Sequence, residues 1–175
     1  MASGNMLFVV GAFALLSLVA LGVNRMILDK TTVMLDTEAS ITAISVAQAM
    51  IDEIQTKSFD AKTKSDSVRI YNTADLTLAS SLGPEENITL PDVSPYQSVV
   101  KYNDVDDYNG YRRTVTTPRL GNFTVVDSAY YVTEANPDVR STPQTFYKKM
   151  VVTVTHPTMK APVRLTDVSV YRRYF

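Results

Sequence analysis

Near its N-terminus the chain carries a long apolar stretch that almost no polar side chain interrupts. Residues 6–23, MLFVVGAFALLSLVALGV, contain no charge and one polar side chain, Ser17. As an α-helix the stretch would rise about 27 Å, close to the roughly 30 Å hydrocarbon core of a bilayer. The pattern therefore predicts a membrane-spanning helix. A secretory signal peptide, suggested by the small residues Ala20 and Gly22, and a buried core helix are the alternatives.

The residues that follow predict that the same helix continues. Glycine is absent between Gly22 and Gly83, and proline is absent before Pro84, so nothing breaks a helix over the next thirty residues or so. One apolar stripe recurs every three to four positions at Ile41, Ile44, Ala47, Ile51 and Ile54. We expect one helix over 6–57, apolar over 6–23 and amphipathic over 24–57. The lower half of the stripe is expected to pack on the protein's own domain.

Beyond residue 58 the pattern changes to that of β-strands. Runs rich in β-branched and aromatic residues occupy 67–71, 97–102, 122–133, 148–156 and 163–173. The last two runs predict a closing antiparallel hairpin around a turn at 157–162. The expected fold class is α+β, a long N-terminal helix packed on a small antiparallel sheet, with residues 1–5 as a leader or tail and 58–175 as the β-rich domain.

Composition narrows the function classes. The 17 Lys and Arg residues nearly balance the 18 Asp and Glu residues and are scattered, so no nucleic-acid partner is expected. No cysteine is present, which excludes disulfides, thiolate nucleophiles and Cys-ligated zinc. The single histidine, His156, lies in a strand pattern without a nucleophile motif or metal-ligand spacing. We therefore expect no enzyme and no small-molecule substrate. Asn87 and Asn122 fit the N-glycosylation sequon.

An acidic loop, DVDDYNG at 104–110, is the strongest candidate for a site. The EF-hand pattern fails, because positions five and six are Tyr108 and Asn109 rather than an oxygen ligand and glycine. Two interpretations remain. One is a calcium site of a different kind, with backbone carbonyls and the side chains of Asp104, Asp106, Asp107 and Asn109 as ligands. The other, which we favour, is a solvated turn between strands in which Asn and Gly supply positive φ.

The order of several segments resembles a known family. LGPE at 82–85, DVDDYNGY at 104–111 and the closing hairpin KKMVVTVTHP with VRLTDVSVYRR follow a long helix that ends in IDEIQTKSFD. Together they resemble the type IV pilin and pseudopilin superfamily, and in particular minor pilins of the mannose-sensitive haemagglutinin type. The resemblance implies a structural subunit of a pilus-like filament or pseudopilus, held in the inner membrane by one span before assembly and then part of an extracellular or periplasmic filament.

The resemblance also assigns roles to residues of the helix. Partners would be copies of the same chain or other pilins, contacted through Met6, Leu7, Phe8, Val9, Val10, Phe13, Leu15, Leu16, Leu18, Val19 and Leu21. Gly11 and Gly22 would let the helix stretch or melt locally on assembly. A leader would be cleaved between Gly4 and Asn5.

The N-terminus departs from the family pattern in three respects. The segment before Asn5 has no basic residue, Asn5 stands where the family has Phe or Met, and Val9 stands where it has a glutamate. Because of Val9, a membrane-tethered periplasmic binding or scaffold domain that never polymerises is the alternative function. A third is an exported adhesin or calcium-dependent binding domain that exposes the acidic loop.

Overall fold

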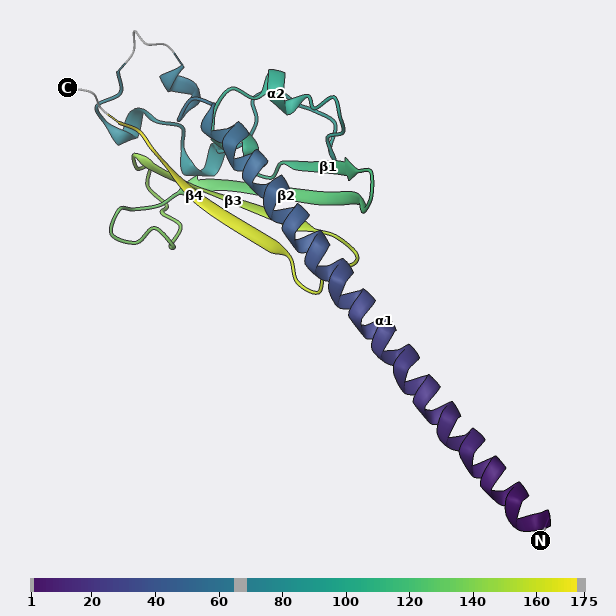
Figure 1. Cartoon of the computed structure of the whole chain (residues 1–175). Helices are drawn as coiled ribbons and strands as arrows, with labels where there is room; N and C mark the ends of the chain where they lie inside the picture. The colour runs from purple at the N-terminus through teal and green to yellow at the C-terminus, as the bar shows by residue number, and fades with distance from the viewer. Residues whose placement is uncertain (1, 65–68, 173–175) are drawn as a thin grey trace. The chain divides into compact units, whose positions relative to one another are not determined.

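A computed structural model of the chain describes residues 2–64 and 69–172, with side chains from Asn5 onward (Figure 1). The chain divides into one compact unit that ends at Glu38 and a second that begins at Ala39. Helix α1, Ala2–Gln55, contributes to both. The helix predicted over 6–57 is thus present, beginning earlier and ending two residues sooner.

The described part of the first unit is the N-terminal part of α1, up to Glu38. The helix is long and apolar enough to cross a membrane. Its hydroxyl side chains bond within the helix: Ser17 Oγ donates to the Phe13 carbonyl at 2.8 Å, and Thr31 Oγ1 donates to the Ile27 carbonyl at 2.9 Å. A hydroxyl that bonds to the carbonyl one turn earlier needs no water. These residues are therefore compatible with an apolar environment.

A four-stranded antiparallel sheet of order β1-β2-β3-β4 forms the second unit together with the end of α1. The strands are β1 Arg112–Thr117, β2 Gly121–Tyr131, β3 Tyr147–Thr155 and β4 Val163–Val170. Cross-strand pairs such as Val125 with Val154 and Val152 with Leu165 set the register. The strands predicted at 122–133, 148–156 and 163–173, and the closing hairpin, are confirmed, although β4 ends at Val170 and residue 173 lies outside the described residues.

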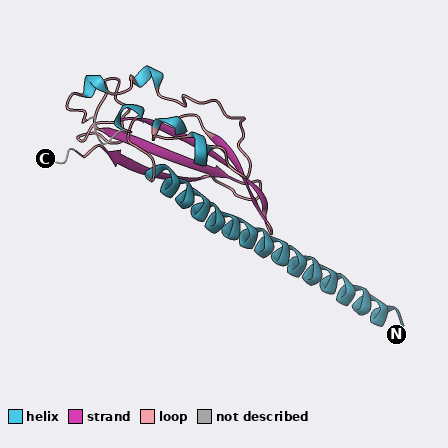
Figure 2. Cartoon of the chain, turned by 90° about the horizontal axis from the view of Figure 1, so that it is seen from above, coloured by secondary structure: helices cyan, strands magenta, loops and turns pink. Residues whose placement is uncertain are grey.

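The end of α1 lies along the sheet (Figure 2). It packs there through a row of small side chains. Ala39, Ala43 and Ala47 are completely buried in the same core as Met50 and Ile54. A row of alanines leaves room for the helix backbone to approach the strands closely. The rest of this core comes from the sheet and the loops before it, including Phe123, Val125, Met150, Val152 and Val154.

The prediction that the lower half of the helix stripe packs on the protein's own domain is confirmed, and its upper half does not pack there. Ile41 and Ile44 are 62% and 49% exposed, although Ala47, Ile51 and Ile54 are buried as expected. The reason is geometric, because Ile41 follows the buried Ala39 by two positions, about 200° around the helix. The alanines define the packed face, and the two isoleucines point away from the sheet.

Two of the predicted strands are absent among the described residues. Of the strand predicted at 67–71, residues 69–71 form no strand, and 67–68 lie outside the described residues. The segment 97–102 contains the short helix α2, Ser98–Lys101. Asp92 explains the helix, because its carboxylate accepts hydrogen bonds from the backbone N–H groups of Gln97 at 3.2 Å and Ser98 at 3.1 Å. This tertiary cap overrides the β propensity of the two valines.

Candidate functional site

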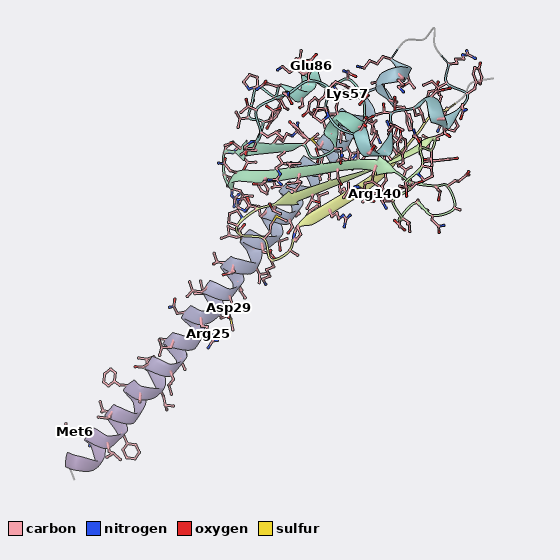
Figure 3. The ribbon with its side chains drawn as sticks, turned by 180° about the vertical axis from the view of Figure 1, so that it is seen from behind. Met6, Arg25, Asp29, Lys57, Glu86 and Arg140 are labelled. Carbon is pink, nitrogen blue, oxygen red and sulfur yellow. The ribbon has the colours of Figure 1, made fainter. Side chains whose placement is uncertain are left out.

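The apolar part of α1 is exposed on every side. All eleven residues expected to mediate assembly are exposed, from 53% for Val9 to 81% for Phe8 (Figure 3). The candidate span is 0% buried within the described structure. The first charged residue after it is Arg25. A fully apolar helix surface of this kind requires lipid or other helices to cover it.

The glycines of this segment sit in regular helix. A Cβ added to Gly11 or Gly22 would meet nothing within 4 Å. Gly4 and Asn5, where leader cleavage is expected, also lie within α1. Neither the expected melting at the glycines nor the cleavage is decided by this geometry, and both stay predictions.

The acidic loop is buried, so its interpretation as a solvated turn is wrong. Asp104, Asp106 and Asp107 are 0%, 0% and 1% exposed. The loop precedes β1 and contains the short 3₁₀ helix η4, Asp106–Tyr108. Gly110 does adopt a positive φ of 84°, but Asn109 has φ −71° and supplies none. The acids therefore serve the interior of the second unit rather than its surface.

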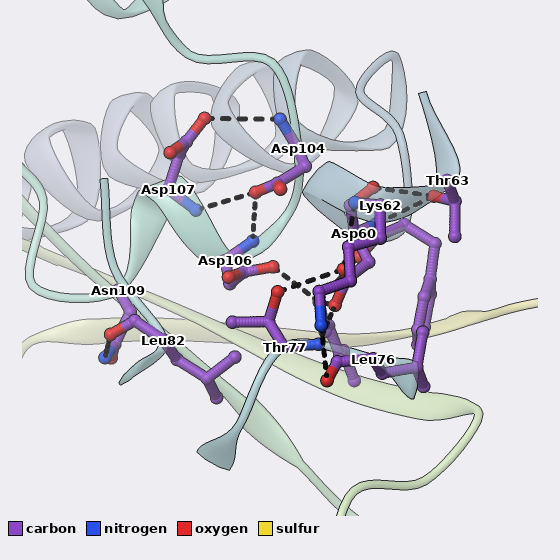
Figure 4. A network of polar contacts seen from close by, with 12 residues as sticks. Asp60, Lys62, Thr63, Leu76, Thr77, Leu82, Asp104, Asp106, Asp107 and Asn109 are labelled. Atoms are coloured by element: carbon purple, nitrogen blue, oxygen red, sulfur yellow. Dashed lines mark hydrogen bonds and ion pairs between the residues drawn. The ribbon is translucent and has the colours of Figure 1, made fainter. Parts of the chain in front are cut away.

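Two of the acids hold the loop's own backbone (Figure 4). Asp104 Oδ1 accepts hydrogen bonds from the N–H groups of Asp106 and Asp107, each at 3.1 Å. Asp107 Oδ2 accepts from the Asn103 N–H at 2.7 Å, and its Oδ1 accepts from the Glu85 N–H at 3.3 Å. Such bonds satisfy backbone donors that the turn would otherwise bury unpaired.

A buried lysine of β3 supplies the positive charge for the third acid. Lys148 is completely buried, and its Nζ donates to Asp106 Oδ1, to Asp60 Oδ2 at 3.0 Å and to the Phe59 carbonyl at 2.8 Å. The ammonium also lies 4.7 Å from the centre of the Phe59 ring. A buried charge is tolerated where ion pairs and hydrogen bonds replace its hydration.

The environment shifts the pKa values of these acids in different directions. Burial, together with the charges of the neighbouring Asp106 and Asp107, raises the pKa of Asp104 to about 8. Burial also raises the pKa of Asp106, because it outweighs the favourable charge of Lys148. Burial opposes ionisation of Asp60 too, but Lys148 and the backbone donors outweigh it and hold the pKa of Asp60 below its usual value.

Glu53 of α1 joins the helix to three other segments. Arg113 Nη1 of β1 lies 2.7 Å from Glu53 Oε2, while Tyr108 Oη and Ser98 Oγ donate to Oε1 at 2.8 and 3.1 Å. Tyr108 is also part of an edge-to-face triad of rings with Tyr102 and Tyr111. This network fixes the end of α1 to α2, η4 and the sheet.

Close to this network lies a carboxyl group without a partner among the described residues. Asp127 points from β2 into the core, is 2% exposed, and neither carboxylate oxygen has a hydrogen bond. Burial raises the pKa of Asp127 to about 8, partly offset by Arg113 and increased by Glu53. The group is consequently protonated around neutral pH in the folded protein.

The predicted calcium ligands do not all converge. Asp104 and Asp106 each bring one carboxylate oxygen within 4.8 Å of one another and of an oxygen of Glu85, a residue outside the predicted set. Asp107 is occupied by backbone donors, and Asn109 Nδ2 donates to the Leu82 carbonyl at 3.0 Å. Geometry thus groups Glu85, Asp104 and Asp106 and leaves Asp107 and Asn109 in structural roles.

The remaining candidates lie away from this cluster. His156 stacks on Phe123, and its Nε2 lies 2.8 Å from the Leu120 carbonyl, a packing role. The sequon residues Asn87 and Asn122 are both exposed.

Lys148 and Asp127 were missed by the sequence reasoning, although a signal existed. Each lies two positions from a core residue on the same face of its strand, Lys148 from Met150 and Asp127 from Val125. A charged residue in register with the buried face of a strand must pair or lose its charge. Asp60 and Glu85 carried no such signal, because they lie in irregular segments.

No family model, no curated protein and no solved structure matches the chain. The protein is therefore classified by its architecture alone. A long apolar N-terminal helix packed on a four-stranded antiparallel sheet is pilin-like.

Proposed function

We propose that the protein is a structural subunit of a type IV pilus-like filament or pseudopilus. The observation that carries the proposal is the apolar surface of α1 over residues 6–23, exposed all round within the described structure. Before assembly the helix would cross the inner membrane once, and lipid would cover this surface. In the filament the same residues would pack against helices of other copies of the chain or of other pilins.

Both environments make the same chemical demand on the segment. A helix satisfies its backbone hydrogen bonds internally, and Ser17 already bonds to the Phe13 carbonyl. In lipid these side chains are already out of water, so the association of the helices would come from close van der Waals packing rather than from burial of apolar surface. Moving from lipid to the filament core then requires no change in polarity.

Assembly is tested by yield in sheared extracellular fibres. Phe13→Ala removes a ring that is 66% exposed but keeps the span apolar, so membrane insertion should persist. Because the ring's packing against neighbouring helices is lost while its surroundings stay apolar, fibre yield should fall, measured by immunoblot of the sheared fraction. Tyr71→Ala, which removes an equally exposed ring from the second unit, should leave the yield unchanged.

A non-polymerising membrane-tethered domain is the competing function, and Val9 favours it. Pilins resembling this chain place a glutamate there, and its absence removes a means of setting the register between subunits. If the chain stays entirely in the membrane fraction under conditions that produce fibres, the tethered domain is the better account. In a filament we expect local stretching of the helix near Gly22. An unbroken helix from Met6 to Lys57 in a filament map would contradict the expected stretching.

A further inference from the structure

We propose that Glu85, Asp104 and Asp106 bind a calcium ion. The proposal concerns the second unit alone and does not depend on filament assembly. One carboxylate oxygen of each residue lies within 4.8 Å of the other two. Carboxylate oxygens are the ligands that calcium prefers, at about 2.3–2.6 Å from the ion, and oxygens that share an ion lie within such a separation.

The free oxygens of the two aspartates are the independent observation. Asp104 Oδ1 is used by two backbone N–H groups and Asp106 Oδ1 by Lys148. Oδ2 of each is buried without a hydrogen-bond partner among the described residues, and both side chains are 0% exposed. A buried carboxylate oxygen without a donor is costly, so this position suits a positively charged ligand.

The charge of the cluster points the same way. Asp60, Asp104, Asp106 and Asp107 are all buried, and Lys148 forms ion pairs with two of them, Asp60 and Asp106. That ammonium is already shared between Asp60 and Asp106. It contacts Oδ1 of Asp106, which leaves Oδ2 of the same residue for a second cation.

The setting favours calcium over other metals. Glu85 is exposed, so an ion can enter from solvent and water can complete the six to eight oxygen ligands that calcium takes, about three of them from protein here. No nitrogen or sulfur ligand is present in the group, which disfavours zinc. Magnesium needs near-octahedral geometry at shorter distances, which three carboxylates from two separate segments do not readily provide.

The test is a calcium titration of the full chain in detergent. We expect saturable heat on adding calcium chloride in isothermal titration calorimetry, with a Kd of about 0.1–1 mM as in extracellular calcium modules, and a rise in Tm at saturating calcium. Glu85→Gln should weaken binding by about tenfold or more, since even second-layer partners of metal ligands are worth that much. Glu86→Gln changes the adjacent exposed carboxylate and should bind calcium as the parent does.

Glu85→Gln is the decisive variant because the exposed side chain can change without disturbing the buried ion pairs. A proton shared between Asp104 and Asp106 is the other way to satisfy the same oxygens, and it predicts neither heat nor a change in Tm at about 10 mM calcium, well above the range of such sites. That result would overturn the proposal. Equal affinity of the Glu85→Gln and Glu86→Gln chains would overturn it as well, since calcium would then bind elsewhere.

Discussion

Asp127→Asn is expected to change how the stability of the second unit depends on pH. The parent side chain is 2% exposed without a hydrogen bond among the described residues, and the charges of Arg113 and Glu53 both act on its pKa. Its pKa is about 8 in the folded protein and about 3.9 in the unfolded chain. Asparagine has nearly the same shape but cannot ionise.

The sign and size follow from proton linkage. Below about pH 4 the carboxyl is protonated in both states, and its contribution to stability is fully present. As pH rises toward the folded pKa of about 8, the unfolded state loses its proton and the folded state keeps it, so stability falls. At about 1.4 kcal/mol per pH unit, the loss between pH 4 and 7 is about 4 kcal/mol.

The variant lacks this loss, so its advantage over the parent should grow by about 4 kcal/mol from pH 4 to 7. An unpaired buried amide costs about 1–3 kcal/mol, a constant that does not alter the slope. Urea unfolding of the full chain in detergent can be followed by near-ultraviolet circular dichroism of the tyrosines, nearly all of which lie from Tyr96 onward. Asp75→Asn, at an exposed carboxyl, is the control. A difference between variant and parent that stays constant across this pH range would refute the account of Asp127.

Three further changes test other parts of the structure. Lys148→Met should destabilise the second unit by about 3–5 kcal/mol in urea unfolding, because Asp60 and Asp106 lose their buried counter-charge. Ala43→Leu should cost about 1–3 kcal/mol by overpacking the helix against the sheet, whereas Ile41→Ala, on the exposed face, should stay within about 0.5 kcal/mol of the parent. Gly22→Ala should raise helix stability by about 1 kcal/mol and, if the helix stretches there on assembly, lower the yield of sheared fibres.

The elements that the sequence predicted well are those with strong local patterns. The helix needed only an unbroken run without glycine or proline, and β3 was evident from the alternation of Val152 and Val154 with threonine and valine. β1 was missed because RRTVTT has no apolar alternation, and its strand state depends on pairing with β2. α2 was missed because its cap, Asp92, lies outside the segment.

The candidate site was predicted only in part, because half of it is non-local. Asp104 and Asp106 were visible as an acidic loop, but neither their burial nor their partners could be deduced from DVDDYNG. Lys148 lies more than forty residues away along the chain, on β3, and Glu85 belongs to an irregular loop. Only the fold brings these segments together, and their positions along the sequence do not predict that they meet.

The Glu53 network has a mechanical consequence. One carboxylate on the last turns of α1 receives donors from Arg113, Tyr108 and Ser98, three segments that are separate along the chain. Tension along the helix would reach the sheet through the buried alanine row and through these three bonds, which would share the load in parallel. Bonds that are loaded together break at a higher force than bonds that break one after another. We therefore expect Glu53 to raise the force needed to pull the end of α1 away from the sheet.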